Sequence, residues 1–205
     1  FNKREVFMGN VEKDVTRGFR TQDVIYCGLF TALMAVGAFI KITLPLGVFE
    51  VTISLQVFFA LLAGFLLGVR NGFVSVLTYL IIGLIGIPVF AHGGGLGYLL
   101  RPTFGFLIGF AFAALFTGML SSREGKPSLP KLAIAALVGE MAYYACGLIY
   151  YFIMFNFVLS GTEGIGIAQL FSVWFLSTVI PDTVICMLAA VLAHRLVPIM
   201  RKMQR

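Results

Sequence analysis

Charge is scarce in this sequence, and its scarcity excludes an ordinary water-soluble fold. Only 12% of the 205 residues are Asp, Glu, Lys or Arg, whereas 60% are hydrophobic, and the mean hydropathy is +0.99. An average soluble domain carries about 25% charged residues. A soluble fold of this length cannot bury so much apolar surface. We therefore expect lipid to be the solvent for most of the chain.

Catalytic and nucleotide-binding motifs are also missing. The chain has no GxxxxGK[ST] phosphate loop, no HExxH pair and no GxSxG turn. Asp182 is the only aspartate inside a predicted span, which leaves no aspartate pair for an intramembrane protease. We expect no enzyme activity, no metal and no cofactor. The net charge of +6 is spread over loops and tails, which disfavours a nucleic-acid partner.

The apolar runs predict an all-α integral membrane protein with six transmembrane helices. A spanning helix needs about 20 apolar residues. The predicted spans are 24–44, 51–69, 73–90, 102–120, 132–159 and 181–196. A short turn at 70–72 separates the second span from the third, and a glycine-rich loop at 92–97 precedes the fourth. In domain terms, we expect a cytoplasmic tail at 1–23, the six-helix domain at 24–197 and a basic cytoplasmic tail at 198–205.

The last apolar run, from Ile165 to Leu196, is too long for one span, and Pro181 divides it. Proline is favoured in the first turn of a helix and disfavoured in the interior. We therefore predict a short lid-like segment at 167–179 and a sixth span that begins at Pro181. A single kinked helix is the alternative.

Positive charge orients the bundle, because loops rich in Lys and Arg stay in the cytoplasm. With six spans, most of the basic residues fall on the side of the two termini, which is therefore cytoplasmic. The two exceptions on the outer side are Lys41 and Arg101. For Lys41 we favour a headgroup anchor.

Two polar side chains on the outer side are the main candidates for ligand binding. Arg101 lies between the glycine-rich loop and a predicted helix start. There, free N–H groups and a guanidinium together make a carboxylate site. Asp182 is predicted in the first turn of the sixth span, where it would accept hydrogen bonds from a ligand amide or ureide. A helix-terminal structural role is the alternative for Asp182. Glu140 lies in the cytoplasmic half of its span, so we do not expect it to touch the ligand.

Further candidates complete a ligand pocket and a partner surface. Aromatic and amide side chains at helical spacing are typical of walls around a ring-shaped ligand. The candidate wall and loop residues are Gln56, Tyr143, Tyr151, Trp174, Gly95 and Thr103. Small residues at spacings of three and four allow another helix to approach the first span closely. These residues are Gly28, Ala32 and Ala35.

The stretch 51–110 resembles the BioY family, the substrate-binding S components of energy-coupling factor (ECF) vitamin transporters. The matching pieces are the Leu55-Gln56 pair, the run 77–90, and the glycine-rich loop followed by Pro102-Thr103. The segment IPDTVICMLAAVLAHRL, residues 180–196, is similar to the last helix of the family.

The resemblance implies six helices with both termini in the cytoplasm and an outward pocket for biotin, closed by loops. It also implies a multi-pass protein of the bacterial cell membrane. The expected partners are a transmembrane coupling subunit, EcfT, and two ATPase subunits of the EcfA type that hydrolyse ATP. In the family, small residues of the first helix contact the coupling subunit, and these correspond to Gly28, Ala32 and Ala35.

Two departures from the family pattern bear on the substrate. The family commonly has GPTGGY after the glycine loop, and here the segment begins Arg101-Pro102-Thr103. Ile185 stands where the family's PGDxxK pattern has its lysine. We interpret the pair of changes as a transfer of positive charge to Arg101. The alternatives are an S component for another small carboxylate, such as lipoate, and a membrane scaffold without transport.

Overall fold

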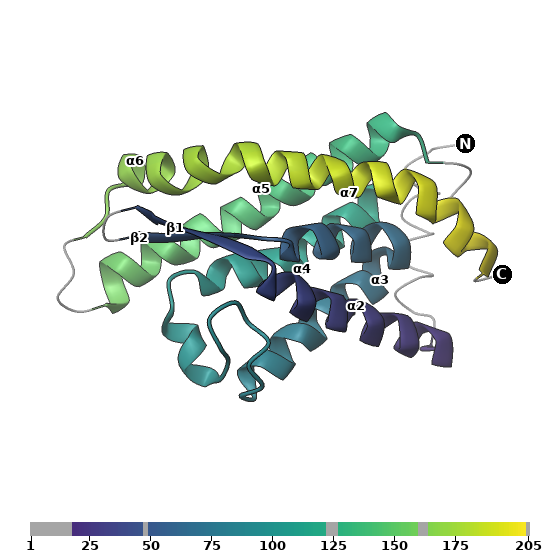
Figure 1. Cartoon of the computed structure of the whole chain (residues 1–205), viewed down its shortest axis with the longest axis horizontal. Helices are drawn as coiled ribbons and strands as arrows, with labels where there is room; N and C mark the ends of the chain where they lie inside the picture. The colour runs from purple at the N-terminus through teal and green to yellow at the C-terminus, as the bar shows by residue number, and fades with distance from the viewer. Residues whose placement is uncertain (1–17, 47–48, 122–126, 160–163, 204–205) are drawn as a thin grey trace.

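The computed structural model describes residues 18–46, 49–121, 127–159 and 164–203 (Figure 1). Long helices lie side by side, and a β-hairpin and a loop region gather at one end of the bundle (Figure 1). In chain order the helices and strands are α2 (Thr21–Phe39), β1 (Lys41–Leu46), β2 (Phe49–Ser54), α3 (Gln56–Leu84), the 3-10 helix η1 (Leu96–Leu100), α4 (Phe104–Leu120), α5 (Leu129–Ile153), the π-helical turn η2 (Met154–Val158), α6 (Ile167–Leu170), the π-helical turn η3 (Phe171–Phe175) and α7 (Leu176–Met203).

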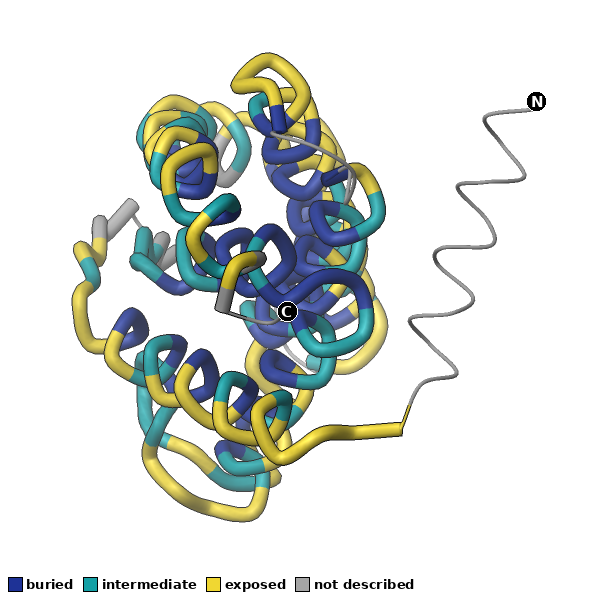
Figure 2. The backbone as a smooth tube through the Cα atoms, turned by 90° about the vertical axis from the view of Figure 1, so that its right-hand side faces the viewer, coloured by how far each residue is buried: buried dark blue, intermediate teal, exposed yellow. Residues whose placement is uncertain are grey.

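The surface of the bundle is apolar, as a lipid-facing protein requires. Among the described residues, four helical segments are long and apolar enough to cross a membrane: Thr21–Phe39, Gln56–Leu84, Leu129–Val158 and Leu176–Met200. Many large hydrophobic side chains on these helices are exposed, for example Ile25, Ile134 and Leu188. Figure 2 shows the buried parts of the backbone turned toward the centre and the exposed parts turned outward. Such a surface is stable only when lipid or detergent covers it.

Helix α3 is folded back on itself at Gly68 and forms a helical hairpin. Gly68 has φ 84° and ψ −171°, a conformation that essentially only glycine adopts. Gln56 and Tyr79 would be about 34 Å apart along a straight helix, yet their side chains share a hydrogen bond of 2.8 Å. The predicted second and third spans are therefore antiparallel helices. The predicted turn at 70–72 was wrong, because the chain reverses at Gly68 and residues 70–72 are already helical.

Close backbone packing holds the helical hairpin together. A Cβ atom added at Gly72 would lie 2.9 Å from the Ala63 carbonyl and from the Gly64 Cα. Only glycine at 72 therefore allows the two halves of α3 to approach so closely. At the end near the bend, the Asn71 amide donates a 3.0 Å hydrogen bond to Asp23, which ties the start of α2 to α3.

An antiparallel β-hairpin replaces the outer ends of the first two predicted spans. Strands β1 and β2 pair with Lys41 opposite Ser54 and Leu46 opposite Phe49. The all-α prediction missed this hairpin, because a short apolar run fits a strand as well as a helix. The β-branched pairs Ile42–Ile53 and Thr43–Thr52 are typical of strands. As a result α3 begins only at Gln56, five residues later than predicted.

The lid-like segment and the helix start at Pro181 were also wrong. Helix α7 contains Pro181 in its interior, and α6 and η3 lead into it without a break. Of the alternative, a single kinked helix, the continuous helical run is observed. Asp182 consequently lies inside α7 rather than in a first helical turn. The π-helical turn at Phe171–Phe175 accommodates irregular backbone hydrogen bonding within the same long helix.

The remaining predicted helices are confirmed with small shifts. Helix α4 spans Phe104–Leu120, and α5 with η2 spans Leu129–Val158. The helix predicted to reach residue 90 ends at Leu84, and a loop follows. Of the predicted tails, 1–17 and 204–205 lie outside the described residues, whereas 198–203 continues α7.

Candidate functional site

A cavity with an empty volume of about 600 Å³, counted with its opening, lies between the β-hairpin, the glycine-rich loop and the helices. It is lined by Thr52, Ser54, Gln56, Val57, Ala91, His92, Tyr98, Thr103, Phe106, Leu107, Phe110, Tyr143, Thr178 and Asp182. Apolar walls with a few convergent polar groups are typical of a small-molecule site. Among the described residues that line it, none is Lys or Arg, and Asp182 is the only one with a carboxylate.

One end of the cavity holds an acid–tyrosine cluster made of Asp182, Tyr143, Tyr144 and Thr178. The hydroxyls of Tyr143 and Tyr144 both donate to Asp182 Oδ2, at 2.6 and 2.7 Å. Tyr144 also shares a 2.7 Å hydrogen bond with Thr178. Asp182 is only 2% exposed, so these donors replace the water that a carboxylate requires. Both hydrogen bonds go to Oδ2, and Oδ1 has no hydrogen-bond partner among the described residues.

A second set of polar side chains forms a hydrogen-bonded chain that begins at β2 and continues on the helical hairpin. Ser54 donates to Gln56 Oε1 at 3.1 Å, and Gln56 Nε2 donates to the Tyr79 hydroxyl at 2.8 Å. Tyr79 then donates to the Val89 carbonyl at 3.0 Å. Gln56 is 2% exposed and lines the cavity. These hydrogen bonds hold the Gln56 amide at the cavity wall and link the loop after α3 to the helical hairpin.

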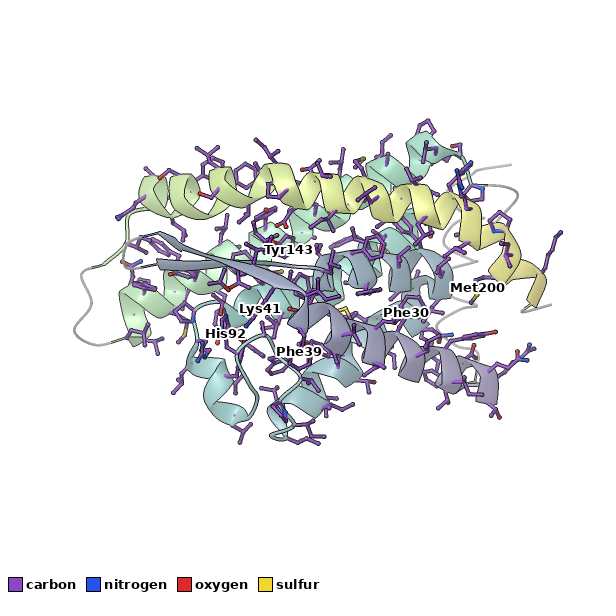
Figure 3. All side chains as sticks on the ribbon, viewed as in Figure 1. Phe30, Phe39, Lys41, His92, Tyr143 and Met200 are labelled. Carbon is purple, nitrogen blue, oxygen red and sulfur yellow. The ribbon has the colours of Figure 1, made fainter. Side chains whose placement is uncertain are left out.

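Two basic side chains, Lys41 of the β-hairpin and His92 of the glycine-rich loop, lie near the cavity, and of the two His92 lines it. Lys41 Nζ donates to the carbonyl of Ala91, and Thr52 shares a 3.3 Å hydrogen bond with His92 Nε2. Ala91 and His92 line the cavity. Figure 3 shows Lys41 and His92 near each other, with Tyr143 further along the bundle. The cavity is therefore lined by a carboxylate on α7 and by His92 of the loop, and Lys41 is hydrogen-bonded to that loop without lining the cavity.

The structure does not bring Arg101 to the cavity. Its side chain is exposed, and its guanidinium carbon lies 5.4 Å from the ring centre of Tyr98. Tyr98 lines the cavity, so Arg101 lies behind the wall and contacts it by a cation–π interaction. Burial raises the pKa of the Tyr98 phenol, and the nearby Arg101 charge partly opposes this rise.

Some of the other predicted site residues line the cavity, and the rest do not. Gln56, Tyr143, Thr103 and Asp182 line the cavity together. Tyr151 is buried elsewhere and stacks on Phe155 at 4.9 Å. Gly95 does not line the cavity, but its backbone N–H donates to the Gly83 carbonyl at 2.7 Å and so holds the loop on α3. The side chain of Trp174 lies outside the described residues.

Several lining residues were missed by the sequence analysis. Thr52 and Ser54 belong to the unpredicted β-hairpin, and Thr178 lies in the segment predicted as a lid. Only the position of Thr178, four residues before Asp182 along one helix, could have indicated that both share a face. The partner-helix candidates lie on α2, where Gly28 and Ala32 are exposed and Ala35 is half-buried.

Comparison with known proteins gives consistent matches over nearly the whole chain. A profile described as "BioY family" matches residues 10–202. A probable biotin transporter BioY of Lysinibacillus sphaericus is 42% identical, over 88% of this chain and 89% of that protein. The biotin transporter BioY of Thermotoga maritima is 36% identical, over 85% and 95%. A crystal structure of the S component for biotin from an ECF-type ABC transporter superposes with a TM-score of 0.71 at 26% identity, covering 87% of this chain and 94% of that one.

Proposed function

The chain belongs to the BioY family, and from this premise we propose that it is the biotin-binding S component of an ECF-type transporter. The observation that carries the proposal is a cavity lined by both acidic and basic groups. Asp182 and Tyr143 line it on the helices, and His92 lines it on the loop to which Lys41 is hydrogen-bonded. Biotin has a ureide with N–H donors on its ring and a carboxylate on its tail. Its two polar ends therefore match the acidic and the basic groups.

The ureide is assigned to the acidic group. Asp182 Oδ1 is the acceptor for a ureide N–H, because both tyrosines already donate to Oδ2. Hydrogen bonds to a charged acceptor are worth about 1.5–3 kcal/mol each. Phe106, Leu107 and Phe110 form apolar walls for the sulfur-containing ring. Gln56 and Thr103 are further polar contacts.

The carboxylate is assigned to the basic groups. Lys41 hydrogen-bonds the loop that lines the cavity, whereas Arg101 stacks on the outside of Tyr98. A ligand carboxylate at the opening would meet Lys41 and His92 first. The role of Arg101 as a direct carboxylate receptor stays a prediction from the sequence, and its position favours an indirect role through Tyr98.

Membrane arrangement and partners complete the proposal. The two halves of α3 count separately, so α2, α3, α4, α5 and α7 supply six spans. The charge pattern supports cytoplasmic termini, a location in the bacterial cell membrane and a cavity that opens outward. Gly28 and Ala32 present a small-residue surface that suits close contact with EcfT, with Ala35 beside it. Two EcfA-type ATPases would supply the energy.

Ligand-dependent thermal stability of the purified protein tests this function. A ligand that binds only the folded state raises the melting temperature. We expect biotin to raise it, and lipoate to raise it far less, because lipoate has no N–H donor for Asp182 and would leave a buried acceptor unpaired. A larger shift with lipoate would assign the protein to another carboxylate. No shift with any ligand would favour a scaffold.

A further inference from the structure

Glu140 is a second buried carboxyl beneath the cavity, and the proposed ligand site does not use it. It lies on α5, one helical turn before Tyr143 and Tyr144, and it is 0% exposed. Thr183, the residue after Asp182 on α7, hydrogen-bonds Glu140 Oε1 at 2.8 Å. Glu140 Oε2 is buried and has no partner in hydrogen-bonding geometry among the described residues. Glu140 does not line the cavity.

The groups around Glu140 do not compensate a negative charge. On α7 its titratable neighbours are Asp182 and the thiol of Cys186, and neither is a cation. On its own helix the titratable neighbours one turn away are the phenols Tyr143 and Tyr144, whose hydroxyls are both directed to Asp182. An ionised carboxylate with one bare oxygen would cost several kcal/mol in this setting. The nearby charge of Asp182 would add to that cost.

The two acids differ in how well they can hold a charge. Asp182 receives two short hydroxyl hydrogen bonds and lines the cavity. Glu140 receives one hydroxyl hydrogen bond, from Thr183, has only the weak thiol donor of Cys186 beside it, and does not line the cavity. A single negative charge shared by this pair is therefore most stable on Asp182. A single proton is most stable on Glu140.

We propose that Glu140 is a resident proton-binding site, a neutral acid that keeps the single negative charge of the α5–α7 interface on Asp182. The negative charge thus stays on Asp182, at the edge of the cavity. That this charge accepts a hydrogen bond from a ureide rests on the proposed function. The protonation of Glu140 itself does not rest on it. Glu140 is then a positioning residue that acts through Asp182.

Infrared spectroscopy of the protein in lipid at neutral pH tests the proposal without a ligand. A protonated carboxyl has a C=O stretching band above the amide I band. We expect this band in the wild type, unchanged in Asp182→Asn and absent in Glu140→Gln. In the wild type the band should shift with ¹³C-labelled glutamate and not with ¹³C-labelled aspartate. This labelling experiment needs no substitution, so it holds even if a variant fails to fold.

Other results would overturn the proposal. They are no such band in the wild type, a band that survives Glu140→Gln, and a band that shifts with labelled aspartate. Because glutamine has the shape of the neutral acid, Glu140→Gln should keep the Kd for biotin within about twofold, and a loss above tenfold would contradict the neutral state. If the band is present and biotin does not bind, the proposed function fails while the proton site stands.

Discussion

Replacing Asp182 by asparagine should weaken biotin binding by about 100-fold while the protein remains folded. The side chain is 2% exposed and accepts hydrogen bonds from two tyrosine hydroxyls through one oxygen. Asparagine keeps the size but loses the charge, and its NH₂ group can face the N–H donors of the ligand. The asparagine oxygen accepts a weaker hydrogen bond than a carboxylate, and one N–H donor is left unpaired. Together these losses cost about 3 kcal/mol of binding free energy, which is about 100-fold in Kd.

Isothermal titration calorimetry of the detergent-solubilised protein measures this loss. The matched control is Asp23→Asn, the same chemical change in the first turn of α2, where Asp23 accepts a hydrogen bond from Asn71 near the bend of α3. The control should leave the Kd within about twofold. If Asp182→Asn binds biotin within threefold of the wild type, the assignment of the ureide to Asp182 is wrong.

Four further substitutions test the basic residues near the cavity and the helix packing. Lys41→Ala should weaken biotin about tenfold and Arg101→Ala less than threefold, measured by calorimetry. The biotin amide lacks the carboxylate, so Lys41→Ala should not weaken its binding. If Lys41→Ala weakens the binding of biotin and of its amide equally, Lys41 does not bind the carboxylate. Tyr144→Phe removes two buried hydrogen bonds and should destabilise the protein by about 1–2 kcal/mol, seen as a lower melting temperature. Gly72→Leu forces the halves of α3 apart, because a Cβ already meets Ala63 at 2.9 Å, and normal yield and stability of that variant would contradict the packing.

The sequence by itself determined that the chain belongs in a lipid environment and where most of its helices lie. Apolar runs are long enough to read without tertiary information, so α4 and α5 were located within a few residues. Asp182 was identified as a candidate because ionisable groups within apolar helices are costly and usually functional. Gln56 and Tyr143 were identified as candidate walls of a ligand pocket.

Tertiary structure alone decided how these residues meet. The strands at 41–54 form because two short apolar segments pair with each other, a choice that local pattern cannot make. Pro181 is tolerated inside α7 because the helix packs along its length and includes a π-helical turn, whereas the local rule predicts a break. Tertiary contacts likewise place His92 in the cavity lining and Lys41 on the same loop, whereas Arg101 does not line the cavity. Which charge faces a cavity depends on contacts between segments about 50 residues apart, and no local spacing encodes them.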